Sequence, residues 1–238
     1  MDWTPFDAAL FDLDGVLTPT ADVHMSAWRQ MFSKYFEDHD VRPAYTDADY
    51  FTYIDGKPRY DGVRAALASR GIELREGDPT DEPGVDTVTG LGNAKNALFD
   101  RMLRDEGVVA FPGTDALLDT LAARDIHVAV VSSSQNARAV LDAAKLADRF
   151  KVVVDGKVAR EAGLAGKPSP ETFEHAAASL GISADRAVVI EDAVSGVAAG
   201  RAGGFGLVVG VDRGAGAQAL RDAGADVVVQ DLTELMPA

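Results

Sequence analysis

Two aspartates lie two residues apart at the end of the chain's first apolar run, in the segment FDLDGV. In extended backbone the side chains of residues i and i+2 point to the same side, so Asp12 and Asp14 face one space while Leu13 faces away. Neighbouring carboxylates with separated pKa values can divide a group transfer: one attacks phosphorus, and the other works as acid and base. The alternative is a polar turn with a capping aspartate, which an isolated pair would favour.

A serine-rich segment follows the apolar run Ile126–Val131. Ser132 stands where the expected strand ends, and Ser133, Ser134 and Asn136 lead into the next helix. A hydroxyl at a strand end, followed by N–H groups at a helix start, suits a phosphoryl oxygen. For such a segment alone, a serine-rich helix N-cap is the more common interpretation.

A lysine lies in the rigid turn Gly166-Lys167-Pro168-Ser169-Pro170, just before an expected helix. Such a turn can hold an ammonium group near developing negative charge, which stabilises a transition state. A lone Lys-Pro pair is more often a surface turn, so Lys167 gains its significance from the other motifs.

Two acids, Glu191 and Asp192, end the apolar run Val188–Ile190 and precede a glycine-containing helix start. Acidic side chains at the end of a buried strand are costly unless something neutralises them, so a bound cation is the simplest explanation. Carboxylate, carbonyl and phosphate oxygens suit Mg²⁺. Mg²⁺ is therefore the expected cofactor.

Each of these motifs lies at the end of an expected strand or just before an expected helix. The expected strands and helices alternate regularly along the chain. The expected strands are Ala8–Leu13, Ile126–Val131, Val152–Val154, Ala187–Ile190, Phe205–Val209 and Asp226–Val229. The expected helices between them are Asp115–Ala123, Ala137–Leu146, Pro170–Leu180, Val194–Ala202 and Ala217–Ala223. Apolar strands that alternate with helices predict an α/β fold, a doubly wound, Rossmann-like parallel sheet whose ligands bind beyond the carboxyl ends of the strands.

A different pattern follows the first strand. Apolar residues recur at helical spacing over residues 21–36, and Tyr60–Ser69 and Asn93–Leu103 also indicate helices. No strand is expected there, and Glu76–Gly92 is predicted as a loop rich in Gly, Pro and Asp. We therefore predict a catalytic core domain of residues 1–20 and 103–238 and a helical cap domain of residues 21–102.

The motifs occur in a fixed order along the whole predicted core. FDLDGVLT resembles the opening motif of the haloacid dehalogenase superfamily, and FDLDGVLTPTADVH is similar to its β-phosphoglucomutase-like branch. The resemblance implies a phosphotransferase with Mg²⁺ as cofactor and a small phosphorylated sugar as substrate.

The resemblance also implies residue roles. Asp12 would be the nucleophile that is transiently phosphorylated, and Asp14 the acid and base. Ser132 would bind the transferring phosphoryl group, and Lys167 would neutralise Asp12 and the phosphoryl oxygens. Dehalogenases of the superfamily lack a second aspartate at the position of Asp14, so its presence favours phosphoryl chemistry.

The ligand sets are implied in the same way. The metal ligands would be Asp12, the backbone carbonyl of Asp14, Glu191 and Asp192. Contacts to the distal phosphate of the sugar would come from Ser134 and Asn136, with Ser133 beside them.

Two helices of the predicted cap carry further matches. His24 occupies the position where the branch has a histidine that couples closure to acid–base chemistry, although a lone histidine on a helix more often packs. Trp28, one turn later, is expected in the cap core and is included among the substrate-binding candidates. Lys95, in Asn93-Ala94-Lys95-Asn96, matches a lysine that contacts the sugar phosphate; an exposed charge on a helix is the competing account.

The segment DGKPRYDG, residues 55–62, resembles the substrate-specificity loop of the branch. Gly56 lies in it, and Arg59 matches the arginine that grips the non-transferring phosphate, for which a forked guanidinium is well suited. Asp55 and Gly62 depart from the branch, whose members carry Lys and Ser there. A solvated loop and a different substrate therefore stay open.

Composition limits the class of partner. The net charge of −15 argues against nucleic acid and an anionic membrane, which both require a basic face. The chain has no cysteine, and no apolar run approaches the roughly 18 residues of a membrane span. The N-terminal segment lacks the pattern of a secretory signal. We expect a cytoplasmic monomer whose anion site is built from a few local charges.

Three functions remain to be compared. The leading one is a β-phosphoglucomutase-type enzyme that interconverts hexose 1-phosphate and hexose 6-phosphate. The second is a sugar-phosphate phosphatase of the same fold, a hydrolase with water as final acceptor. The third, a silent binding module, predicts degenerate catalytic carboxylates, whereas all four acids are present.

Overall fold

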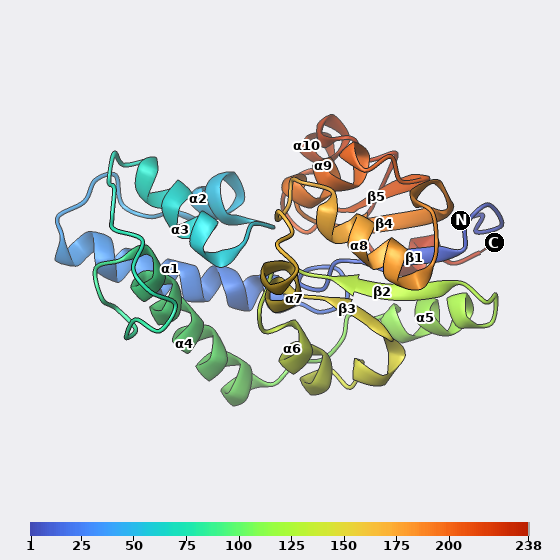
Figure 1. Ribbon diagram of the computed structural model, residues 1–238, viewed down its shortest axis with the longest axis horizontal. Helices are drawn as coiled ribbons and strands as arrows, with labels where there is room; N and C mark the ends of the chain where they lie inside the picture. The colour runs from blue at the N-terminus through green and yellow to red at the C-terminus, as the bar shows by residue number, and fades with distance from the viewer. Residues whose placement is uncertain (238) are drawn as a thin grey trace. The chain divides into compact units, whose positions relative to one another are not determined.

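The computed structural model describes residues 1–237. The chain forms two compact units (Figure 1): the sheet unit consists of Met1–Thr20 and the chain from Val108 onward, and the helical unit consists of Ala21–Gly107. The junctions lie between Thr20 and Ala21 and between Gly107 and Val108. Helix α4 (Val88–Glu106) continues past residue 102, where the cap domain was expected to end.

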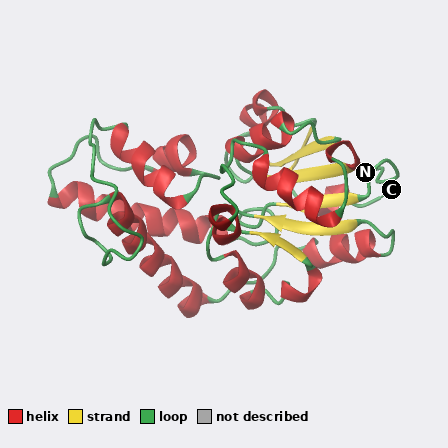
Figure 2. Ribbon diagram, viewed as in Figure 1, coloured by secondary structure: helices red, strands yellow, loops and turns green. Residues whose placement is uncertain are grey.

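The sheet unit contains a six-stranded parallel sheet in the order β3-β2-β1-β4-β5-β6 (Figure 2). Its strands are β1 (Ala8–Phe11), β2 (His127–Val131), β3 (Val152–Val154), β4 (Ala187–Glu191), β5 (Leu207–Val211) and β6 (Val227–Val229). The predicted doubly wound α/β fold is confirmed, and all six predicted strands are present.

Helices and short 3₁₀ segments lie between the strands and, in the case of η4, after the last one. They are α5 (Thr114–Ala122), α6 (Ala137–Ala143), η2 (Ala147–Arg149), α7 (Gly156–Glu161), α8 (Glu171–Leu180), η3 (Ala184–Arg186), α9 (Val194–Ala202), α10 (Ala217–Ala223) and η4 (Leu232–Leu235). Phe173 of α8, Val197 of α9 and Leu220 of α10 share one apolar cluster with the strands, so these helices cover one face. The direction of the crossovers reverses after β3, and right-handed connections therefore place α5 and α6 on the other face. The sequence did not predict α7, which is too short to display a helical period.

The position of β1 determines where polar groups gather. Its neighbours are β2 and β4, so the strand order reverses beside it, as at the ligand sites of doubly wound sheets. Phe11 is paired with Val130 of β2 and Ile190 of β4. Because the three strands are in register and parallel, the residues that follow them emerge together at one edge.

The helical unit consists of α1 (Thr20–Asp38), α2 (Asp47–Asp49), the π-helical turn η1 (Tyr50–Ile54), α3 (Arg59–Ala68) and α4. No strand occurs within residues 21–107, all of which the structure describes. An apolar cluster joins the helices: Trp28 and Phe32 of α1 pack with Val63 of α3 and Leu91 of α4. Helix α1 thus presents its apolar side to the other helices of the unit.

The predicted loop Glu76–Gly92 is wrong at its end, because α4 begins at Val88. Thr87 caps the helix: its hydroxyl accepts a hydrogen bond from the Gly90 N–H at 2.9 Å. Gly92, which suggested a loop, is required by packing, since a Cβ there would lie 2.7 Å from the ring of Tyr60. Close packing therefore explains a glycine that the sequence pattern assigned to a turn.

A buried ion pair fixes α2 to α3. Arg70 donates to both oxygens of Asp49 at 2.8 Å, and the Asp49 carboxylate also accepts from the Thr46 N–H at 2.7 Å. The Arg70 side chain is 3% exposed and lies over the ring of Phe36. Hydrogen bonds from Arg70, more than any other cause, lower the pKa of Asp49.

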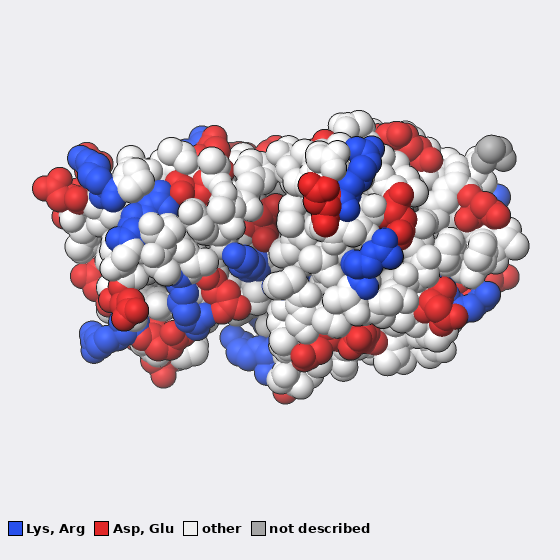
Figure 3. All heavy atoms as spheres, turned by 90° about the horizontal axis from the view of Figure 1, so that it is seen from above, with Lys and Arg blue, Asp and Glu red and all other residues white. Residues whose placement is uncertain are grey.

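Charged side chains of both signs are scattered among uncharged ones on the surface. Figure 3 shows Lys and Arg interspersed with Asp and Glu on the face that it presents. Among residues 1–237, no helix combines the length and the apolar character that crossing a membrane requires.

We expect Asp49→Asn to lower the free energy of unfolding by about 3 kcal/mol, because it leaves the buried Arg70 without its counter-charge. The folded-state pKa of Asp49 is lowered, so its contribution is complete above pH ~4 and is lost as the pH falls further. Urea unfolding followed by circular dichroism at pH 7 and pH 3 measures both effects. Asp47→Asn is the matched control, since the Asp47 side chain is 53% exposed; equal losses in both variants would contradict the assignment.

Candidate active site

A lysine and two carboxylates form a buried cluster at the carboxyl ends of β1 and β4. Lys167 Nζ donates to Asp12 Oδ1 and to Glu191 Oε1, each at 2.5 Å, and to the carbonyl oxygen of Val131 at 3.0 Å. Asp12 is 7% exposed, Lys167 3% and Glu191 fully buried. The three N–H bonds of the ammonium are thereby all used, which fixes its position. The sequence motifs of these three residues, far apart in the chain, meet at one point.

The charges of this cluster do not balance. Burial raises the pKa of Asp12 well above its usual value; the charge of Lys167 opposes this shift, and the charges of Glu191 and Asp14 add to it. Burial alone would lower the pKa of Lys167, but the two carboxylates outweigh it and raise that pKa. One cation thus faces more than one buried carboxylate, and an additional cation would be stabilised here.

Glu191 is held by the protein on both sides. Its Oε1 accepts from Lys167, and its Oε2 accepts from the Ala193 N–H at 2.7 Å. A Cβ on Gly196 would collide with the carboxylate, so glycine is required in the first turn of α9. Glu191 therefore fixes the position of Lys167. The sequence predicted Glu191 as a metal ligand and did not suggest this second role.

Two hydroxyls hold the carboxylate of Asp14. Thr20 Oγ1 donates to Oδ1 at 2.5 Å, and Ser132 Oγ donates to Oδ2 at 3.3 Å. Thr18 Oγ1 lies 2.8 Å from Thr20 Oγ1 and extends this network. Ser132 was among the predicted site residues and neither threonine was, although hydroxyls four and six residues after Asp14 were a usable signal.

Gly15 allows Asp192 to approach the turn after Asp14. Gly15 has a φ of +91°, and a Cβ there would collide with the Asp192 carboxylate. Asp192 is 7% exposed. No cluster of three or more His, Asp and Glu side chains within residues 1–237 has the spacing of a formed metal site. The donor set nevertheless consists of oxygen atoms with excess negative charge, which fits a hard dication such as Mg²⁺.

The serine segment after β2 is folded back on itself and against β3. The Ser134 N–H donates to Ser132 Oγ, and the Asn136 N–H donates to Ser134 Oγ, both at 3.1 Å. The Gly156 N–H donates to the Ser134 carbonyl at 3.1 Å, and a Cβ on Gly156 would lie 2.7 Å from the Ser133 carbonyl. The segment thus takes a fixed shape that depends on its neighbour after β3.

Asp155 is a buried acid that the sequence analysis missed. It is 1% exposed, follows β3 and caps α7, accepting from the N–H groups of Lys157 and Val158 at 2.9 Å. Its position, an acid before a glycine at the end of an apolar run, repeats that of Asp14 and could have identified it.

The predicted substrate-binding residues of the helical unit form two groups. His24 contacts the Lys95 ammonium and stacks on Phe99, and Lys95 Nζ lies 5.2 Å from the ring centre of Trp28. Lys95 is 2% exposed and Trp28 4%, so neither is a solvated surface residue. Their burial favours a specific role for the lysine over the alternative of an exposed helical charge.

Arg59 belongs to the second group. Its Nη2 donates to Asn96 Oδ1 at 2.6 Å, which links the start of α3 to α4. Gly56, in the turn before α3, has a φ of +71°. Gly62, one of the departures from the branch, has Ile54 and Trp28 within 4 Å of a built Cβ, so its small size fits this packing.

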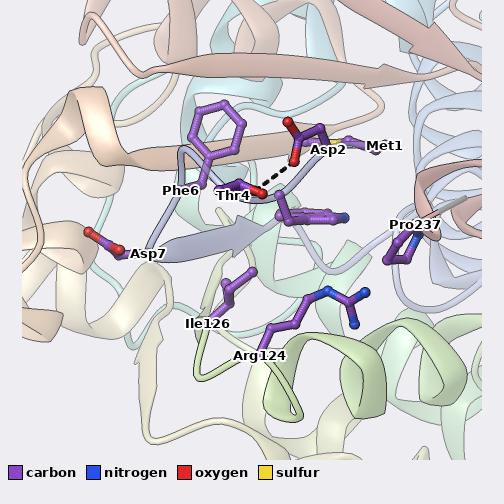
Figure 4. Close-up of a pocket in the computed structure, with 9 residues that line it drawn as sticks. Met1, Asp2, Thr4, Phe6, Asp7, Arg124, Ile126 and Pro237 are labelled. Atoms are coloured by element: carbon purple, nitrogen blue, oxygen red, sulfur yellow. Dashed lines mark hydrogen bonds between the residues drawn. The ribbon is translucent and has the colours of Figure 1, made fainter.

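A pocket of about 380 Å³ lies at the opposite, amino-terminal ends of the strands (Figure 4). Residues before β1 and before β2 line it, among them Phe6, Arg124 and Ile126. It contains none of the predicted site residues.

The fold and the cluster together define a haloacid dehalogenase-like α/β protein: Asp12 directly follows the first strand of the sheet, Asp14 lies two residues further on, and a distant lysine pairs with Asp12. The model of the haloacid dehalogenase-like hydrolase family matches residues 6–204, and the chain belongs to that family.

Relatives place it in the β-phosphoglucomutase-like branch of the family. A protein of Mycobacterium bovis named β-phosphoglucomutase is 52% identical over 96% of this chain and 91% of its own length. One of Bacillus subtilis with the same name is 31% identical over 96% of this chain and 91% of its own. A crystal structure of β-phosphoglucomutase from Clostridium difficile shares the fold, with a TM-score of 0.77, 24% identity and coverage of 97% of this chain and 93% of that one.

We expect Lys167→Met to lower the free energy of unfolding by about 3–5 kcal/mol, because it leaves buried carboxylates without a counter-charge. Lys167→Met combined with Glu191→Gln should cost less than the sum of the single substitutions, since Glu191 no longer carries an unpaired charge. Urea unfolding of the three variants in excess chelator tests this. Strict additivity would contradict the coupling of the two side chains.

Proposed function

We propose that this protein is a Mg²⁺-dependent phosphomutase of the β-phosphoglucomutase type, which converts β-glucose 1-phosphate to glucose 6-phosphate. The observation that carries the proposal is the buried contact of Asp12 with Lys167 at 2.5 Å, at the switch point of the sheet. Identity of 52% to a protein named β-phosphoglucomutase supports this substrate. A cytoplasmic, monomeric enzyme is part of the proposal.

In the proposed cycle, phosphorylated Asp12 gives its phosphoryl group to a hydroxyl of the sugar phosphate. The bond from phosphorus to Asp12 breaks as the bond to the sugar oxygen forms, and Asp14 takes the hydroxyl proton. The resulting bisphosphate reorients. Asp12 then attacks its other phosphorus, and Asp14 returns the proton to the leaving sugar oxygen. No water is consumed, and the enzyme ends phosphorylated as it began.

The remaining core residues stabilise charge in this scheme. Lys167 holds Asp12 in place and offsets the negative charge of the phosphoryl oxygens. Ser132, which contacts Asp14, would donate to a phosphoryl oxygen. Mg²⁺ held by Asp12, the Asp14 carbonyl and Asp192, with Glu191 as the further predicted ligand, would stabilise the charge on the transferring group.

The helical unit supplies the proposed recognition of the sugar phosphate. Arg59 and Lys95 would bind the phosphate that is not being transferred, and His24, Trp28 and Gly56 complete the predicted set of this unit. The predicted substrate-binding residues of the sheet unit are Ser133, Ser134 and Asn136. A mutase requires such a second anchor because its intermediate carries two phosphates. The burial of Lys95 and the bond of Arg59 to Asn96 support preformed positions for these cations.

A sugar-phosphate phosphatase is the second candidate. Asp55 and Gly62 favour it, because they stand where characterised mutases of the branch carry Lys and Ser. The loss of a lysine would weaken the hold on a second phosphate, and water would then be the final acceptor.

One assay distinguishes the two. β-Glucose 1-phosphate with Mg²⁺ and a trace of glucose 1,6-bisphosphate should give glucose 6-phosphate, measured by a coupled dehydrogenase, well in excess of free phosphate from the same sample. Free phosphate as the main product would assign the protein to the phosphatases.

We expect Asp12→Asn to lower kcat by roughly 10⁴-fold or more, because the nucleophile is lost. Asp119→Asn, an exposed substitution on α5, is the control; high residual activity of Asp12→Asn would rule out the covalent scheme.

Arg59→Ala tests the phosphate anchor. Loss of a charge-assisted contact should lower kcat/KM for β-glucose 1-phosphate roughly 10- to 100-fold. Phosphorylation of Asp12 by acetyl phosphate, which has no second phosphate, should be unchanged. Arg64→Ala is the matched control, because Arg64 lies on the same helix and pairs with Glu76. Equal loss with both donors would contradict an anchoring role.

A further inference from the structure

Arg213 contacts the backbone of the turn that follows the two catalytic aspartates. It lies two residues beyond β5, and its Nε donates to the carbonyl oxygen of Gly15 at 3.1 Å. Gly15 follows Asp14 directly and has a φ of +91°. Arg213 belongs to none of the predicted motifs, so this contact links a separate part of the chain to the catalytic turn.

An aromatic ring also contacts the guanidinium of Arg213. Its central carbon lies 4.0 Å from the centre of the Phe111 ring, within the range of a strong cation–π contact. The Phe111 N–H in turn donates to the carbonyl of Leu17 at 2.9 Å. Arg213 and Phe111 therefore form one stacked pair that contacts the turn at two carbonyl groups, those of Gly15 and Leu17.

Few other groups compete for the guanidinium of Arg213. Its Nη2 is buried and has no hydrogen-bond partner among residues 1–237. The charge of Arg213 also contributes, after the hydrogen bonds from Thr233, to the lowered pKa of Asp231. No ion pair of Arg213 within 4 Å is found among residues 1–237, and the Gly15 carbonyl is the acceptor that the partly buried side chain meets.

Two further contacts fix Gly15. The Gly15 N–H donates to the Thr18 carbonyl at 2.8 Å, and the Asp192 carboxylate occupies the space that a Cβ on Gly15 would need. Gly15 is therefore held by Thr18, Asp192 and Arg213. Because Gly15 is bonded directly to Asp14, a shift of Gly15 would displace the Asp14 backbone as well.

We propose that Arg213 is a positioning residue for the catalytic turn: by binding the Gly15 carbonyl and stacking on Phe111, it holds Asp12 and Asp14 in the geometry that phosphoryl transfer requires. The role in catalysis rests on the proposed function, whereas the bracing of the turn does not. A displacement of about 1 Å in a reacting group can cost two orders of magnitude in rate, so one backbone contact can matter to turnover without contacting substrate.

The kinetic test uses Arg213→Ala in the full-length protein. We expect kcat for β-glucose 1-phosphate to fall roughly 10- to 100-fold with little change in KM, because the misplaced groups act in the transition state. Added guanidinium ion, at concentrations that do not denature the protein, should restore part of kcat by occupying the space over Phe111. Methylammonium, which cannot stack in this way, should not.

Two further variants are measured alongside Arg213→Ala. Arg201→Ala is the control, because Arg201 of α9 pairs with Asp226 beside β5 and leaves the turn untouched. It should keep the native kcat. Arg213→Lys keeps the charge without the planar group, and should recover only part of kcat; it also serves if Arg213→Ala does not fold.

Hydrogen–deuterium exchange tests whether Arg213 stabilises the turn, independently of the enzyme's turnover. The peptide that covers residues 10–18 should exchange faster in Arg213→Ala and Arg213→Lys than in the native protein, and at the native rate in Arg201→Ala. Unchanged exchange of this peptide in both Arg213 variants would overturn the inference, whatever the enzyme does. Faster exchange with native kcat would overturn the catalytic part. If the native protein converts no sugar phosphate, the proposed function fails, and the exchange result alone decides whether Arg213 braces the turn.

Discussion

The buried ammonium of Lys167 is the interaction on which the site depends. It donates to Asp12, Glu191 and the Val131 carbonyl, and thereby ties the ends of β1, β2 and β4 together. Two carboxylates share this one charge in a place where water cannot screen them. Transfer of a phosphoryl group to Asp12 would add negative charge at the same point. A site with this imbalance gains from any further cation that its oxygen atoms can bind, and the arrangement of protein groups already favours such an ion.

The sequence predicted that the carboxylates of this cluster lie close together, because their positions follow from strand register. Apolar runs identified β1 and β4, parallel pairing aligned their ends, and the polar residues after each strand then had to meet. Lys167 lies in no strand, and its place was inferred from a resemblance to a family pattern. The structure supplies the physical reason for that pattern: Glu191 receives the second N–H of the lysine, and Gly196 provides the space for the carboxylate.

The features that the sequence did not predict depend on tertiary contacts. Helix α4 starts at Val88 because Thr87 caps it and Gly92 fits against Tyr60. A Gly-rich sequence pattern cannot distinguish such packing from a loop. The partnership of Arg213 with the Gly15 carbonyl joins residues 198 positions apart, and no local period signals it. Similarly, Lys95 has the spacing of an exposed helical residue, yet aromatic rings enclose it. Local patterns determine elements and their order; they do not determine which polar groups are buried between them.

The net charge of −15 is compatible with an anionic substrate because of the range over which charges act. At physiological ionic strength the Debye length is about 8 Å, so exposed acids on the surface are largely screened from a site more than that distance away. Groups within a few ångströms in a buried environment, such as Lys167, act almost unscreened. Affinity for phosphate is therefore set by where cations are buried and not by their total number. The surface charge instead affects solubility and the rate at which an anion approaches, so the acidic composition and the buried cations have separate physical roles.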